Sequence, residues 1–166
     1  LKPEESTSIE AGIRTQYEWG GVETNIYKTS LENLIDWACT ANCSDPDPYA
    51  QDWLPSNVSE AEITGLELRL NAQLLGWHSQ LEMSWVDPVD ESTNKVLQLR
   101  AKRTAKLDFQ RKFGPASVGL SVVAQSSRFA NPANTEELGG YGITNLRAAW
   151  ALGEQLTLQG RVENVG

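Results

Sequence analysis

The two cysteines, Cys39 and Cys43, have the clearest chemical potential in this sequence. Thiols this close in the chain close a small disulfide loop in an oxidising compartment, or bind a metal when further ligands complete the set. Only one histidine is present, His78, so a complete metal set is not suggested. If the CTANC segment faces an oxidising exterior, we expect a Cys39–Cys43 disulfide; a free, reduced pair is the alternative.

Three aspartates follow directly in the segment SDPDPYAQDW, at Asp45, Asp47 and Asp52. Carboxylate oxygens are the ligands that calcium prefers, but the spacing does not match an EF-hand loop. Aspartate next to proline is ordinary turn chemistry. We favour a turn and keep calcium bound in an outside loop as the alternative; no other cofactor is expected.

Aromatic side chains in the same segment, Tyr49 and Trp53, offer flat apolar faces to a large ligand. A loop that packs on its own aromatic rings explains them equally well. His78 is interpreted as a solvated or hydrogen-bonded side chain. The sequence has no nucleophile elbow, phosphate loop or paired-acid motif, so we do not interpret the chain as an enzyme.

Composition narrows the class of protein. The 166 residues suffice for one domain with a sizeable core. The net charge of −8 argues against nucleic acid as a partner, because that needs a basic face. The mean hydropathy of −0.41 resembles that of a soluble protein, but membrane barrels dilute the hydropathy signal through alternating strands.

A period of two dominates the chain. In GLELRLNAQLLG, Leu66, Leu68, Leu70 and Leu74 share one side of an extended chain, while Glu67, Arg69, Asn71 and Gln73 share the other. Similar alternation recurs along the chain and predicts about eight long strands. It is least regular from Val22 to Trp37, where we expect a β-bulge near Ile26–Tyr27.

Short and long connections alternate between these strands. Tight glycine turns are expected at WGG, LG, FGP and LGE, and they are separated by long polar links. Those links are Ala38–Glu60, about Asp87–Val96, and Ala130–Gly139. All short turns therefore lie at one end, as in an all-β, antiparallel, up-and-down transmembrane β-barrel.

Aromatic residues near the strand ends support a membrane barrel, in which aromatic girdles flank an apolar band. Six lie near the short turns: Tyr17, Trp19, Trp77, Phe109, Phe113 and Trp150. Four lie near the long links: Trp37, Trp85, Phe129 and Tyr141. In this interpretation the leucines of GLELRLNAQLLG face outer-membrane lipid and the charged residues line a wet lumen.

Two other classes remain open at this point. A soluble eight-stranded, lipocalin-like ligand-binding barrel would place the leucines inside and the charges outside. A structural outer-membrane barrel of eight strands would have no transport role.

Three segments carry a resemblance to a known family. LKPEES (Leu1–Ser6), NVSEAEITGLELRL (Asn57–Leu70) and RVENV (Arg161–Val165) resemble elements of TonB-dependent outer-membrane receptors. YKTSLENLIDW (Tyr27–Trp37) and LQLRAKRTAKLDFQ (Leu97–Gln110) resemble the cobalamin-receptor branch. The resemblance covers nearly the whole chain.

The resemblance implies a barrel of about 22 strands around a plug, in the bacterial outer membrane. We expect residues 1–166 to be the C-terminal portion of the β-barrel domain, without the plug and the final strand. The implied function is active nutrient uptake driven by the TonB energy-transducing complex through the plug. The implied ligand is a small molecule, cobalamin; a siderophore or other metal chelate is the alternative.

Overall fold

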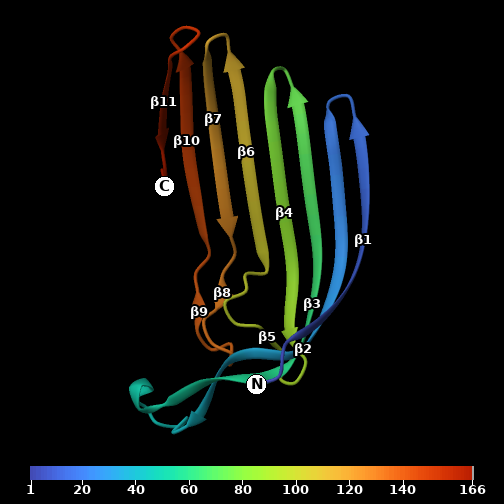
Figure 1. Cartoon of the computed structure of the whole chain (residues 1–166), viewed down its shortest axis with the longest axis vertical. Coiled ribbons are helices and arrows are strands. Elements are labelled where there is room, and N and C mark those ends of the chain that lie inside the picture. Colours follow the sequence, from blue (N-terminus) through green and yellow to red (C-terminus); the bar gives the residue numbers. More distant parts are fainter. Residues whose placement is uncertain (166) are drawn as a thin grey trace.

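The computed structural model describes residues 1–165, with Pro48, Val58 and Ser59 described by their backbone alone. Eight long strands form one antiparallel sheet in chain order (Figure 1). They are β1 (Glu5–Tyr17), β2 (Gly20–Ala41), β3 (Asp52–Leu74), β4 (Trp77–Asp90), β6 (Arg103–Phe113), β7 (Ala116–Gln125), β10 (Tyr141–Ala151) and β11 (Thr157–Val162). The expected all-β, up-and-down arrangement of about eight strands is confirmed.

Shorter elements occupy the connections. A two-residue strand, β5 (Lys95–Val96), pairs with β4, and β8 (Arg128–Phe129) pairs with β9 (Glu137–Leu138). One 3-10 turn, η1 (Pro48–Ala50), lies between β2 and β3.

The four tight turns lie at the same end of the sheet, at the top of Figure 1. Between β3 and β4 the chain reverses through Leu75 (φ 52°) and Gly76 (φ 79°), the left-handed pair that suits the twist of a two-residue hairpin. Gly114, between β6 and β7, also has a positive φ of 57°. The expected alternation of short turns and long links is confirmed.

The register separates the two faces of the sheet. Leu70 lies opposite Leu81, which lies opposite Leu107. One residue further along each strand, Asn71 lies opposite Gln80 and Gln80 opposite Asp108. Because side chains alternate along a strand, these pairings continue as one apolar row and one polar row on opposite faces.

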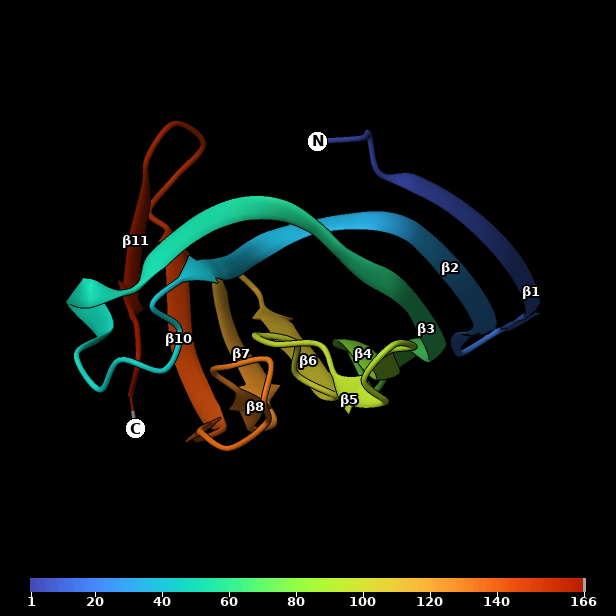
Figure 2. The ribbon, with the colours of Figure 1, turned by 90° about the horizontal axis from the view of Figure 1, so that it is seen from below.

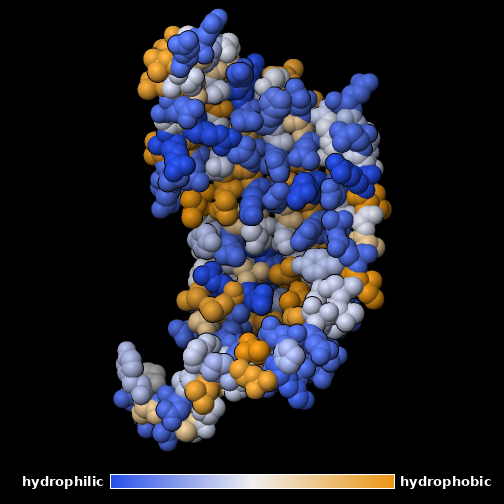
Figure 3. Space-filling view, in the orientation of Figure 1, coloured by the Kyte–Doolittle hydropathy of each residue, from blue (hydrophilic) through white to orange (hydrophobic). Residues whose placement is uncertain are grey.

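The curvature of the sheet shows which of its two faces is concave and which is convex. Seen along the strands, the sheet forms a trough (Figure 2), and the face that lies inside it is largely hydrophilic (Figure 3). The leucines of GLELRLNAQLLG therefore lie on the convex face and its charged residues on the concave face. This is the arrangement of a barrel wall around a wet lumen, as expected for a membrane barrel.

The convex face is exposed, and the described residues contain almost no core. Only Ala61 and Leu97 are buried hydrophobic residues, whereas Ile13 is 69% exposed and Leu158 65% exposed. A soluble chain of this length buries far more of its apolar side chains. The missing partner of the convex face is therefore a lipid environment.

The sheet is open. Among the described residues β1 pairs only with β2, and β11 only with β10, so both outer strands have an unpaired edge. A closed eight-stranded barrel, whether soluble and lipocalin-like or a structural membrane barrel, needs these two strands to pair. The structure therefore favours part of a larger barrel over both alternatives.

Strand β4 gives the height of the apolar band. Trp77, the first residue of β4, and Trp85, the last residue of β4 that pairs with β6, lie on the convex face opposite Leu74 and Leu66. Eight residues span about 26 Å of strand, or about 20 Å along the membrane normal at a 40° tilt. This approaches the roughly 25 Å apolar band of outer-membrane barrels. In residues 1–165 no helix has the length and hydropathy needed to cross a membrane.

The aromatic belt near the long links, at the end of the sheet away from the tight turns, is less complete than the sequence suggested. Tyr141 lies opposite Gln125 on the polar, concave face, because the register of β10 on β7 has no shift. Trp37 and Phe129 lie outside the regular part of the sheet, in the β2–β3 extension and in β8. Of the four aromatic residues expected at this end, only Trp85 faces the convex side of the main sheet.

One expectation about an irregular segment of β2 was wrong. The β-bulge predicted near Ile26–Tyr27 is absent, since β2 keeps continuous register with β1 and β3 there. The first shift comes between Leu31 and Leu34. Tyr27 fits the regular β2–β3 pairing because its partner on β3 is Gly65. The Tyr27 ring occupies the space that a side chain at position 65 would fill.

The long links also differ from the sequence expectation. Strands β2 and β3 continue through most of the predicted 38–60 loop, so the connection itself is 42–51. Strand β4 continues to Asp90, and the link before β6 extends to residue 102, beyond the predicted end at about Val96. Leu99 has a φ of 58°, which interrupts the extended backbone there.

Candidate ligand-binding surface

The β2–β3 hairpin is the longest element and reaches beyond its neighbours. At the end away from the tight turns it bends and arches over the open side of the trough (Figure 2). The bend coincides with the register shifts around Leu34 and with Asn33, whose φ is 57°. Local irregularity of the ladder therefore directs this hairpin across the mouth of the lumen.

Side chains hold the bend in place. The Nδ2 group of Asn57 donates to the carbonyl oxygen of Asn33 at 2.6 Å. The amide of Ile35 donates to Oε1 of Glu4 at 2.7 Å, and the amide of Lys2 donates to Oδ1 of Asn57 at 2.7 Å. The segment before β1 is thus attached to the base of the arch.

The tip of the arch contains the predicted cysteines. Cys39, near the end of β2, and Cys43, in the connection, are joined in a disulfide, with their Cα atoms 5.7 Å apart. Because β2 ends at Ala41, this bond closes the loop at the start of the connection. The hairpin tip is thereby tied by a covalent bond as well as by ladder hydrogen bonds.

The aspartates of the tip form turns. Oδ1 of Asp45 accepts from the amide of Asp47 at 2.9 Å, and Oδ1 of Asp47 accepts from the amide of Tyr49 at 3.0 Å. Asp47 thereby caps the 3-10 turn, while Asp52 begins β3. Within residues 1–165 no three acidic, histidine or cysteine side chains gather as metal ligands, so calcium at this loop stays a prediction without a formed site.

A cavity of about 270 Å³ lies beneath the arch. The arch contributes Asp36, Trp37 and Trp53, and the links below contribute Leu97, Gln98 and Pro132. The indole Nε1 of Trp53 donates to Oε1 of Gln51 at 3.2 Å. Mixed aromatic and polar lining of this kind is typical of small-molecule sites, although the volume is at their lower limit.

Of the two predicted ligand contacts, Tyr49 and Trp53, only one lies at the cavity. Trp53 lines the cavity, whereas Tyr49 is 96% exposed on η1 and is not part of the lining. Sequence reasoning missed Trp37 at this site, because it was assigned to an aromatic belt. The positions of the two tryptophans could have indicated this. Trp37 lies just before Cys39, Trp53 lies just after the loop, and Cys39 is directly opposite Trp53 in the β2–β3 pairing.

Hydrogen bonds between the links form the floor of this cavity. Nε2 of Gln98 donates to Oδ2 of Asp36 at 2.8 Å, which joins the floor to the arch. Asn134 exchanges two hydrogen bonds with the backbone of Val96, each 2.9 Å long. Three segments far apart in the sequence therefore meet at the mouth of the trough.

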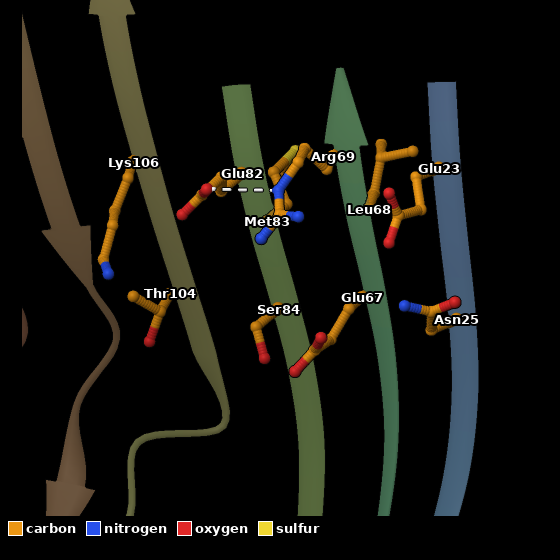
Figure 4. Close-up of a pocket in the computed structure, with 10 residues that line it drawn as sticks. All are labelled: Glu23, Asn25, Glu67, Leu68, Arg69, Glu82, Met83, Ser84, Thr104 and Lys106. Atoms are coloured by element: carbon orange, nitrogen blue, oxygen red, sulfur yellow. Dashed lines mark hydrogen bonds and ion pairs between the residues drawn. The ribbon is translucent and has the colours of Figure 1, made fainter. Parts of the chain in front are cut away.

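Deeper in the trough, the concave wall has a row of alternating charge (Figure 4). Neighbouring strands place Arg14, Glu23, Arg69, Glu82 and Lys106 opposite one another in turn. Nε of Arg69 lies 3.3 Å from Oε1 of Glu82, and a cavity of about 360 Å³ lies against this row. His78 is on the same face, opposite Gln73 and Gln110. Such a wall binds water and polar groups.

The comparisons with known proteins agree with this geometry. A family model described as "TonB dependent receptor-like, beta-barrel" matches residues 1–165. This chain belongs to the TonB-dependent receptor family. Its strands are therefore barrel strands of the outer membrane of Gram-negative bacteria, as the sequence resemblance implied.

Curated relatives in this family include two proteins named "Vitamin B12 transporter BtuB". The one from Photobacterium profundum is 27% identical over 165 residues, covering 99% of this chain and 27% of the relative. The one from Vibrio vulnificus (strain YJ016) is 28% identical, covering 99% of this chain and 25% of the relative. The chain thus spans about a quarter of the length of these TonB-dependent receptors.

Solved structures show the same fold. The copper transporter OprC superposes with a TM-score of 0.80 at 19% identity, over 99% of this chain and 26% of OprC. The pyoverdine outer membrane receptor FpvA from Pseudomonas aeruginosa PAO1 superposes with a TM-score of 0.75 at 22% identity, over 99% and 26%. In TonB-dependent receptors, as in other outer-membrane barrels, the short turns are periplasmic and the long loops extracellular. The arch therefore lies on the extracellular side.

Proposed function

We propose that this chain forms barrel wall and extracellular loops of a receptor for active uptake of a small, scarce nutrient across the outer membrane. The observation that carries the proposal is the match to the receptor family along residues 1–165, together with the arched hairpin over a polar trough. The function is transport, not catalysis, and its energy is supplied by TonB acting through a plug.

Cobalamin is the ligand that we propose first. Both curated relatives described above bear the name of a vitamin B12 transporter. The segments Tyr27–Trp37 and Leu97–Gln110 resemble the cobalamin branch, and both contribute to the cavity beneath the arch. A siderophore or other metal chelate is the second candidate, because the LKPE and GLE elements are shared across the branches of the family.

The size of the cavity limits how such a ligand would bind. At about 270 Å³ it holds only part of a molecule as large as a corrinoid. The ligand would therefore rest in the mouth of the trough and place one apolar edge against Trp37 and Trp53. Aromatic rings provide large contact areas with little loss of conformational entropy, which suits a flat macrocycle.

The test uses the full-length receptor that contains this chain. The purified receptor is titrated with cyanocobalamin and, separately, with a ferric siderophore, and uptake of each is measured in cells lacking their own receptors. We expect saturable binding of cyanocobalamin and uptake that stops when TonB is deleted. Binding of the ferric siderophore alone would replace cobalamin with the second candidate, and uptake independent of TonB would contradict the transport proposal.

A further inference from the structure

Arg111 occupies an unusual position for a charged residue. It lies on β6 in the convex row, opposite Trp77 on β4 and Val118 on β7. This row is close to the tight turns, at the border of the apolar face. The two other residues on its own strand that share this face nearby are Phe109 and Phe113.

Aromatic rings and a turn surround the guanidinium group. Cζ of Arg111 lies 5.5 Å from the ring centroid of Trp77 and 4.6 Å from that of Phe113. These two rings meet edge to face at 6.2 Å, and Trp77 also stacks on Phe109 at 4.5 Å. Nε of Arg111 lies 3.6 Å from the point where a Cβ would be at Gly76. Cation–π contacts hold this cation in one place.

Arg111 has no anionic partner among residues 1–165. The arginines at positions 14, 69, 147 and 161 each form an ion pair. Among the described residues Arg111 forms none, as is also true of Arg100, Arg103 and Arg128, but of these four it is Arg111 whose guanidinium lies over aromatic rings. Its neighbours in the convex row are aromatic or aliphatic. A half-buried cation at the edge of an apolar face is costly unless an anion from outside the chain completes it.

We propose that Arg111, with Trp77 and Phe113, binds the phosphate group of a glycerophospholipid in the periplasmic leaflet of the outer membrane. The phosphate has the charge that the guanidinium lacks, and the planar fork of arginine donates two parallel hydrogen bonds to it. The rings lie where the glycerol and upper acyl groups of that lipid would pack. The inference depends on the convex face being the lipid face, and it is independent of which nutrient is transported.

Native mass spectrometry of the full-length receptor in a maltoside detergent tests the proposal, with palmitoyl-oleoyl phosphatidylglycerol as the added lipid. The variant Arg111→Gln keeps the side-chain stem and removes the charge. We expect it to bind the lipid about tenfold more weakly than the parent, the loss typical of a charge-assisted hydrogen-bond pair. Arg111→Lys keeps the charge and should retain part of the affinity.

Lys112→Gln is the matched control. Lys112 is the next residue in the chain and faces the concave side, opposite Ser117, so the same charge is removed from the other face. Diacylglycerol with the same acyl chains provides a phosphate-free probe, for which no variant should differ. Heat-modifiable electrophoretic mobility verifies that each barrel is folded.

Each other outcome overturns the proposal. Equal losses for Arg111→Gln and Lys112→Gln would show a general attraction to charge, and no loss for either would show that no such site exists. A loss that is equally large with diacylglycerol would assign the contact to the apolar rings. If Arg111→Gln fails to fold, Arg111→Lys takes its place, and an equal change in its affinity for the phospholipid and for diacylglycerol would exclude the phosphate contact.

Discussion

Arg147 on β10 reaches across β7 to Asp108 on β6, and the two side chains meet above Gly119. Nη1 and Nη2 of Arg147 donate to the two carboxylate oxygens of Asp108 at 2.8 and 2.7 Å. A Cβ at Gly119 would lie only 2.5 Å from Nε of Arg147. The missing side chain on the middle strand is therefore what lets two non-adjacent strands form this ion pair on the concave wall.

Gly119→Ala should break this clamp. The added methyl group occupies the path of the Arg147 side chain, so the pairing energy with Asp108 is expected to fall from about 1 kcal/mol to near zero. A double-mutant cycle with Arg147→Ala and Asp108→Ala, in the parent and in the Gly119→Ala receptor, measures this coupling. Gly142→Ala is the control, because nothing lies within 4 Å of its Cβ position. A coupling energy that persists in Gly119→Ala would refute the role of the glycine.

Gly65→Ala should destabilise the barrel at the β2–β3 pair. The ring of Tyr27 lies over Gly65, and its Cζ atom occupies the space that an added Cβ would need. Forcing the ring away is expected to cost about 1–3 kcal/mol of unfolding free energy in a urea titration of the folded receptor in vesicles. Tyr27→Ala in the same chain should remove most of that cost. If the double variant is no more stable than Gly65→Ala alone, the overlap is not the cause.

Charge substitutions on adjacent residues test which face meets lipid. Leu81 is in the convex row between Leu70 and Leu107, and Gln80 is in the concave row. Leu81→Lys is expected to lower the unfolding free energy by about 2–4 kcal/mol, the cost of lysine at the middle of a bilayer. Gln80→Lys should cost less than about 1 kcal/mol. Equal effects in urea titrations in lipid vesicles would contradict the assignment of the two faces.

Reduction of the Cys39–Cys43 disulfide should loosen the hairpin tip and leave the barrel folded. Closing so short a loop stabilises it by about 2 kcal/mol in the chain-entropy treatment. Limited proteolysis of the full-length receptor should therefore cut the 42–51 connection several-fold faster with a reducing agent, or in Cys39→Ser. Cleavage in the 130–136 link is the internal reference. Unchanged cleavage at 42–51 would mean that the ladder alone holds the tip.

Trp53→Ala should weaken ligand binding where Tyr49→Ala does not. Trp53 lines the cavity beneath the arch, whereas Tyr49 is almost fully exposed on η1. Loss of one aromatic contact is expected to raise the dissociation constant for cyanocobalamin about tenfold. Calorimetric titration of the full-length receptor gives this value for both variants. A loss confined to Tyr49→Ala would place the ligand outside the arch and not under it.

Much of the regular sheet was predictable from the sequence because its signals are local. Alternation along Leu66–Leu74 and the glycines of the tight turns depend on neighbouring residues only, and such signals indicated the number of long strands and the tight turns that join them. The errors came where distant segments interact. Tyr27 disturbs the alternation of hydropathy without a bulge because Gly65, on the next strand, makes room for its ring.

The arch was the part that local pattern could not show. Polar residues in 38–60 suggested a loop, but the two flanking strands continue by pairing with each other, and pairing partners far apart in the chain leave no local signature. The same holds for the cavity, where Gln98 meets Asp36 from a different link.

The sequence by itself determined the strand period, the end at which the turns lie and the family, since each is recorded in short runs of residues. Only the tertiary structure decided that the leucine face is convex, that Trp53 and not Tyr49 reaches the cavity, and that Arg111 has no anionic partner within residues 1–165. Those three facts depend on the curvature of the sheet and on contacts between strands. Curvature and contact arise when the whole sheet is assembled.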